Sequence, residues 1–130
     1  GTIVRINLAQ GLKEKWRIRL PGITLSRVPL ITGTRIYVLT AGGTVINLYR
    51  RNGEEEWRRK LGDTPLEGGC FFKNNIYIHD SYGTIYKLDA RGTIHDRFYG
   101  ESRIISGLLP YKDGLFFISE KGQLVIYRLN

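Results

Sequence analysis

The chain of 130 residues contains one cysteine, two histidines and no long apolar run. Cys70 has no second cysteine for an internal disulfide, and its setting in Gly69–Phe72 predicts a small buried side chain rather than a reactive thiol. No stretch approaches the ~18 apolar residues of a membrane-spanning helix, and no charged-then-apolar secretory leader opens the chain. His79 and His95 lack partners at ligand spacing, and no phosphate-binding glycine loop occurs, so we expect neither a metal nor a cofactor.

What the chain does have is one short phrase repeated four times. The copies begin at Gly1, Gly43, Gly83 and Gly122, at steps of 42, 40 and 39 residues. A second marker predicts that three aromatic residues spaced by 40 and 40 positions are structurally equivalent: Tyr37, Tyr77 and Phe117. Self-similarity at this period is typical of stacked units, none of which can bury its apolar face alone.

Each period contains several short strands joined by tight turns. Runs of β-branched and aromatic residues alternate with turns that carry glycine and asparagine, which indicates antiparallel hairpins. The expected strands are Arg35–Thr40, Thr44–Tyr49, Glu54–Leu61, Asn75–His79, Thr84–Leu88 and Thr93–Tyr99. The signal is weaker for the leading strands Arg27–Ile31, Glu67–Phe72 and Arg103–Leu109. No long period of 3.6 residues occurs, so we expect no helix.

The repeat predicts an all-β fold, a β-propeller or part of one, made of four-stranded antiparallel blades. We expect one array over residues 1–130, divided into a partial blade (1–26), two blades (27–63 and 64–102) and a second partial blade (103–130). The strands then fall into groups of two, four, four and three.

The phrase Gly43–Trp57 resembles the repeat of quinoprotein-type (pyrroloquinoline-quinone-like) β-propellers, which reads approximately Gly-x-hydrophobic-Tyr-x-Leu-Asp-x-x-Thr-Gly-x-x-x-Trp. The resemblance implies that Trp16 and Trp57 stack between neighbouring blades. Asp89 keeps the acidic residue of the repeat, whereas Asn7 and Tyr49 replace it, and the third repeat has no tryptophan.

The resemblance to this family separates into fold and activity. Quinoprotein dehydrogenases need a complete ring, a calcium site and, in many members, adjacent cysteines; this chain has one cysteine and no acidic calcium loop. Relatives without a cofactor act as assembly factors, sensors or docking platforms. The resemblance therefore favours the non-catalytic branch, and it leans towards the cell envelope.

Basic residues outnumber acidic ones, 20 to 12, giving a net charge of +8. Much of this charge falls on expected outer strands, as a candidate basic rim: Lys13, Lys15, Arg17, Arg19, Arg58, Arg59 and Lys60. Such a rim would attract nucleic acid or another polyanion. The alternative is that charge on exposed edge strands prevents aggregation. The acidic run Glu54–Glu56 beside Arg58–Lys60 favours the second interpretation.

The function we expect first is binding of a protein partner through one face of the array. The candidate residues lie in second-to-third strand turns and inter-blade loops: His79, Asp80, Tyr82, Tyr99, Glu101, Glu120 and Lys121. His79-Asp80-Ser81 has the residue types of a hydrolytic triad, but adjacent strand residues point to opposite faces, so we expect no catalysis. Polyanion binding is the second hypothesis, and a quinone-dependent enzyme is a distant third.

The phase of the repeat also predicts partners for the array itself. The first blade lacks its inner strands and the last lacks its outer one, so we expect further blades. They would come from a longer chain, which we favour, or from a second copy whose Glu14–Leu20 pairs with Gln123–Leu129.

Overall fold

The structure is a computed structural model that describes residues 1–7, 9 and 11–129. The described residues form thirteen strands and no α-helix. The first six are β1 (Thr2–Asn7), β2 (Lys13–Arg19), β3 (Leu30–Ile31), β4 (Arg35–Leu39), β5 (Thr44–Tyr49) and β6 (Glu55–Lys60). The others are β7 (Leu66–Phe72), β8 (Asn75–Asp80), β9 (Ile85–Leu88), β10 (Ile94–Phe98), β11 (Leu109–Tyr111), β12 (Gly114–Ile118) and β13 (Leu124–Arg128). Within this described part, no helix is long and apolar enough to cross a membrane.

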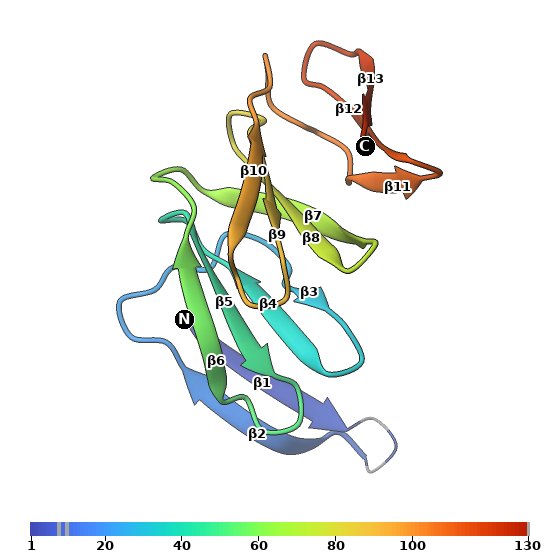
Figure 1. Ribbon diagram of the computed structural model, residues 1–130. Coiled ribbons are helices and arrows are strands. Elements are labelled where there is room, and N and C mark those ends of the chain that lie inside the picture. Colours follow the sequence, from blue (N-terminus) through green and yellow to red (C-terminus); the bar gives the residue numbers. More distant parts are fainter. Residues whose placement is uncertain (8, 10, 130) are drawn as a thin grey trace.

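The strands form four antiparallel sheets that follow one another in chain order (Figure 1). We call them blade 1 (β1–β2), blade 2 (β3–β6), blade 3 (β7–β10) and blade 4 (β11–β13). Each is a meander in which neighbouring strands are consecutive in the sequence. The predicted all-β class and the strand groups of two, four, four and three are confirmed.

Two of the leading strands are shorter than expected. The predicted strand Arg27–Ile31 is reduced to Leu30–Ile31, and Arg103–Leu109 is replaced by Leu109–Tyr111. Pro29 interrupts the first segment because proline has no N–H to donate to a sheet. Ahead of β3 and β11, the chain forms isolated antiparallel β-bridges, one between Leu25 and Thr40 and one between Ile104 and Ser119.

The pairing register corrects one predicted equivalence. Val38 pairs with Ile46, Ile78 with Tyr86 and Phe117 with Val125, so the last step of the repeat is 39 residues. Phe116, and not Phe117, therefore takes the place of Tyr37 and Tyr77. Phe117 instead points back towards blade 3.

The step of 39 residues instead of 40 arises in the turn between the third and fourth strands of blade 3. In blade 2 the Tyr49 N–H donates to the Glu54 carbonyl, whereas in blade 3 the Asp89 N–H donates to Thr93. The second turn is therefore one residue shorter. A turn can lose a residue while the strands beside it stay paired, so the period changes and the antiparallel meander is kept.

The core consists of three apolar clusters, one between each pair of successive blades. Blade 1 packs Ile3 and Ile18 against Ile46 and Leu48 of blade 2. The other two clusters repeat this arrangement between blades 2 and 3 and between blades 3 and 4. Each blade is therefore buried by its neighbours rather than by its own strands.

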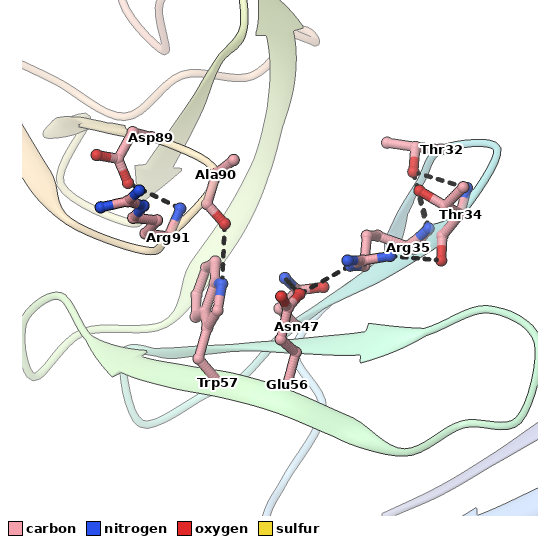
Figure 2. A network of polar contacts seen from close by, with 9 residues as sticks. All are labelled: Thr32, Thr34, Arg35, Asn47, Glu56, Trp57, Asp89, Ala90 and Arg91. Carbon is pink, nitrogen blue, oxygen red and sulfur yellow. Dashed lines mark hydrogen bonds and ion pairs between the residues drawn. The ribbon is translucent and has the colours of Figure 1, made fainter.

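The two tryptophans occupy equivalent places between blades. Trp16 Nε1 donates to the Arg50 carbonyl at 2.8 Å, and Trp57 Nε1 donates to the Ala90 carbonyl at 3.1 Å (Figure 2). The Trp57 ring lies on Gly92, where an added Cβ would stand 2.9 Å from the ring. Each ring therefore locks the outer strand of one blade onto a turn of the next, the position that the family resemblance implies.

Candidate interaction face and pocket

The second-to-third strand turns and the inter-blade connectors meet on one side of the array, which we call the connector face. One hydrogen bond recurs there in each repeat. Its three copies run from the N–H of Ala41 to the carbonyl of Thr24, from Ser81 to Pro65, and from Glu120 to Arg103. These bonds hold each turn against the connector that leads into its own blade.

Five of the predicted interaction residues are exposed on the connector face. Tyr82 is 70% exposed and Tyr99 is 76% exposed, which is unusual for aromatic side chains. Glu101, Glu120 and Lys121 are also exposed. The turn that carries Tyr82 lies against the connector that carries Tyr99, because Gly83 is in contact with Gly100 and Ser102.

His79 and Asp80 were also predicted on this face, but both are only 3% exposed. Asp80 is a structural cap: its Oδ1 accepts from the N–H groups of Tyr82 at 2.9 Å and Thr84 at 3.0 Å. Its Oδ2 accepts from the hydroxyls of Thr64 at 2.9 Å and Tyr86 at 3.3 Å. Both side chains are inaccessible to a partner. The spacing Asp-x-x-Gly-Thr, typical of an Asx turn, was the signal for this role.

His79 lies at the inner end of the interface between blades 3 and 4. Burial lowers the pKa of His79, so its ring is neutral at pH 7. Its Nδ1 has no hydrogen-bond partner among the described residues, and its Nε2 would stand 2.8 Å from a Cβ added at Gly68. The ring is therefore neutral and almost fully buried.

An ion-pair cluster beside His79 joins three blades. Arg103 Nε donates to Glu67 Oε1 at 2.8 Å, and Arg27 Nη2 donates to Glu67 Oε2 at 3.3 Å. Burial of Glu67 opposes its ionisation, but the hydrogen bonds from the two arginines outweigh it and lower the pKa of Glu67. The sequence pattern does not reveal this cluster, because Arg27 and Arg103 stand 40 and 36 positions from Glu67.

The predicted basic rim is partly engaged within the chain. Arg17 pairs with Glu14 at 2.7 Å, and Arg58 pairs with Glu55 at 2.6 Å. Arg59 Nε donates to the Gly92 carbonyl at 2.8 Å. Lys13, Lys15 and Arg19 are exposed on β2, and Lys60 lies 3.4 Å from Asp63. Acidic side chains lie on the same two strands, Glu14 on β2 and Glu55 and Glu56 on β6.

Glu56 was expected to lie in a solvated acidic run, but it organises a polar network in blade 2 (Figure 2). It accepts from Arg35 Nε at 2.8 Å and from Asn47 Nδ2 at 3.0 Å. A bulge beside Trp57 turns Glu56 towards the sheet and so links three strands. Sequence alternation alone could not show this bulge.

A cavity of about 320 Å³ opens on the connector face between blades 3 and 4. Its lining is formed by Tyr99, Gly100, Glu101, Ser102, Phe117, Ser119, Gln123, Val125 and Tyr127. Two of the lining rings pack against each other, since the centroids of Phe117 and Tyr127 lie 5.6 Å apart. Among the described residues, no group of three His, Cys, Asp or Glu side chains is placed to hold a metal ion.

Antiparallel blades that repeat along the chain and stack face to face define this molecule as a β-propeller array. A family model described as outer membrane protein assembly factor BamB matches residues 1–94. The chain therefore belongs to this family of propellers with pyrroloquinoline-quinone-like repeats, and the predicted resemblance is confirmed. Comparison with curated proteins gives no match.

Two solved structures share the fold. The crystal structure of BamB from Moraxella catarrhalis matches with a TM-score of 0.81 and 16% sequence identity, over 98% of this chain and 39% of that chain. The computationally designed Ika4 protein matches with a TM-score of 0.68 and 16% identity, over 78% of this chain and 64% of that chain. Identity this low shows the fold alone. The chain spans well under half the length of the Moraxella protein.

Proposed function

We propose that this chain is a non-catalytic propeller module that binds a protein partner through the connector face. The observation that carries the proposal is the pair of exposed rings, Tyr82 and Tyr99, beside the charged residues Glu101, Glu120 and Lys121. Tyrosine is enriched in protein interfaces because its ring supplies contact area and its hydroxyl supplies a hydrogen bond. The family description, an assembly factor of outer membrane proteins, supports a protein partner and a place in the cell envelope.

The enzyme hypothesis has no support from the triad-like residues. His79 is buried and neutral, and both carboxylate oxygens of Asp80 accept hydrogen bonds from the turn and its neighbours. A general base must reach the proton that it removes, and these side chains face the interior. We therefore assign them to stability.

Photo-crosslinking tests the proposed face. Benzoylphenylalanine placed at position 82 or 99 should give adducts with the same protein in cells of the source organism. The matched control is position 112, since Lys112 is exposed on a turn between first and second strands, away from the connectors. Adducts of the same pattern from all three positions would contradict a specific connector face.

Polyanion binding is the alternative, and the exposed side chains Lys13, Lys15, Arg17 and Arg19 on β2 favour it. Neutralisation of DNA phosphates gives a steep negative slope of log affinity against log salt. If the affinity for DNA does not change with salt, and positions 82 and 99 give adducts, the results favour protein binding over polyanion binding.

We also propose that further propeller blades cover the outer face of blade 4. Leu109, Ile118, Leu124 and Ile126 of this face are 60%, 43%, 69% and 54% exposed. In blade 3, the equivalent positions of the hairpin are packed by the next blade, and Tyr77 is only 2% exposed. These blades would belong to a longer chain or to a second copy.

A further inference from the structure

The cavity between blades 3 and 4 stands where the preceding interface is filled by a tyrosine. Tyr86 pairs with Ile78, and Val125 pairs with Phe117 at the same place in the next hairpin. The Tyr86 ring is 6% exposed and sits between blades 2 and 3. Blade 4 therefore has a valine where blade 3 has a tyrosine, and it lacks a phenol ring at this position.

The polar partners of that tyrosine are also replaced by smaller groups. In blade 3, Asp80 Oδ2 accepts from the Tyr86 hydroxyl at 3.3 Å and from Thr64 Oγ1 at 2.9 Å. In blade 4, Ser119 takes the place of Asp80, because its N–H donates to Gln123 as that of Asp80 donates to Thr84. Ser102 likewise takes the place of Thr64. Ser102 directly precedes Arg103, and Thr64 directly precedes Pro65. The carbonyls of Arg103 and Pro65 accept equivalent copies of the hydrogen bond that recurs between turn and connector.

All three replaced positions line the cavity, which therefore offers open space and two hydroxyl groups beside the position that Tyr86 fills in blade 3. Val125, Ser119 and Ser102 stand around it, and Glu101 also belongs to its lining. Phe117 and Tyr127 are the aromatic rings of its lining nearest to Val125, and their centroids lie 5.6 Å apart. Aromatic rings at such distances favour a further ring in tilted contact. A volume of about 320 Å³ lies within the range of side-chain and ligand sites.

We propose that this cavity, which we call the Val125 pocket, binds a tyrosine side chain of the partner protein. The phenol ring would lie on Phe117 and Tyr127, and its hydroxyl would donate to an oxygen of Ser119, Ser102 or Glu101. The proposal rests on the proposed function, because it names the part of the partner that the connector face receives. Blade 3 supplies the template, with its own Tyr86 in the equivalent place.

A free tyrosine analogue tests the pocket without the partner. N-acetyl-tyrosinamide, titrated into ¹⁵N-labelled protein, should shift the amide signals of residues 99–102 and 123–127. N-acetyl-phenylalaninamide should bind roughly fivefold more weakly, because it lacks the hydroxyl and leaves the polar wall without its hydrogen bond. Equal binding of the two probes, or no shift at these residues, would overturn the proposal.

Two matched variants locate the binding. Val125→Tyr should fill the pocket from within, as Tyr86 does in blade 3, and abolish the shifts caused by N-acetyl-tyrosinamide. Ile126→Tyr adds the same ring to the opposite face of β13, where Ile126 is 54% exposed, and should leave binding intact. Binding retained in Val125→Tyr would contradict the pocket. If Val125→Tyr fails to fold, the comparison of the two probes on the unaltered protein still decides.

The outcomes for pocket and face can be told apart. Adducts from positions 82 and 99 without binding of N-acetyl-tyrosinamide would reject the Val125 pocket and keep the protein-binding function. Binding of the probe without position-specific adducts would show that the pocket accepts a tyrosine side chain but would reject a partner at the connector face as its source. Adducts that persist unchanged in folded Val125→Tyr would show that the partner does not insert a tyrosine there.

Discussion

At the scale of single residues, a few side chains decide how one blade meets the next. Trp57 combines a large ring with one directed hydrogen bond to Ala90, and Gly92 leaves room for that ring. Asp80 satisfies two N–H groups and two hydroxyls at once. Residues of this kind cost much more to replace than the charges on the strand surface.

The first prediction contrasts two neighbours on β6. Trp57→Ala should lower the free energy of unfolding by about 3 kcal/mol, since it removes buried area and leaves a cavity between blades. Arg58→Ala should change it by within about 0.5 kcal/mol, because its ion pair with Glu55 is exposed to solvent. Urea denaturation measures both. Equal losses would show that the faces of β6 are assigned wrongly.

The second prediction concerns the glycine beneath that tryptophan. Gly92 has φ +82°, and an added Cβ would stand 2.9 Å from the Trp57 ring, so Gly92→Ala should cost about 2 kcal/mol or more. Gly42→Ala is the control, because nothing lies within 4 Å of its Cβ position. Similar melting temperatures of the two variants would contradict the proposed contact.

At the scale of strands and turns, equivalent positions in successive blades carry different chemistry on one backbone. His79 of β8 takes the place of Leu39 of β4, since each precedes the residue, Asp80 or Thr40, that begins the next turn. Leu39 is fully buried in the apolar cluster between blades 2 and 3. His79 occupies a similarly enclosed place but brings an unpaired nitrogen.

The third prediction follows from that comparison. His79→Leu should raise the free energy of unfolding by about 1 kcal/mol at pH 7, because it removes a buried nitrogen without a partner. The pKa of His79 is lowered in the fold, so its neutral form favours folding above the ordinary value of 6.5, and this stability is lost as the pH falls through the folded pKa. The variant should therefore lose less stability than the unaltered chain below pH 6.5. Denaturation at pH 7 and pH 5 compares them, and an unchanged difference would contradict the assignment.

The fourth prediction concerns the ion-pair cluster that joins three blades. The pKa of Glu67 is lowered in the fold, so its contribution is fully present above the ordinary value of 4.5 and is lost as the pH falls through the folded pKa. Glu67→Gln should destabilise the protein at pH 7 and flatten the fall in stability below pH 4.5. Glu54→Gln, at an exposed position, is the control. A fall that is equally steep in Glu67→Gln would assign the acid sensitivity to other groups.

At the scale of the whole molecule, burial comes from the stacking of blades. The outer face of blade 4 has nothing packed on it among the described residues, and its apolar side chains remain exposed. Exposed apolar patches of this kind promote association.

The fifth prediction tests that face. We expect the chain of residues 1–130 to associate or to bind a hydrophobic dye, and Leu124→Lys with Ile126→Lys to reduce both, because each replaces an apolar side chain that is more than half exposed. Light scattering and dye fluorescence measure the effect. A monodisperse monomer that is stable on dilution and binds no dye would contradict this expectation.

The sequence alone determined the local architecture of this protein. Hairpin turns such as Ala41–Gly43 and the alternation beside them depend on neighbouring residues, so the strands Thr44–Tyr49 and Asn75–Asp80 could be located to within a residue. The period of about forty residues was enough to predict blades and the face on which Tyr82 lies. The family resemblance added the stacking of Trp16 and Trp57.

Only the tertiary structure decided what each blade presents to the next. The loss of one residue in the turn after Asp89 shifted Phe117 to the opposite face, which equal spacing concealed. His79 and Asp80 proved buried, and Asp80 is enclosed by its own turn, by Tyr86 and by Thr64 of the preceding connector. Glu67 pairs with arginines of two other blades. The Val125 pocket arises where Ser102 of a connector meets Ser119 and Val125 of blade 4. Its existence depends on how two blades fit together, and no local pattern encodes that fit.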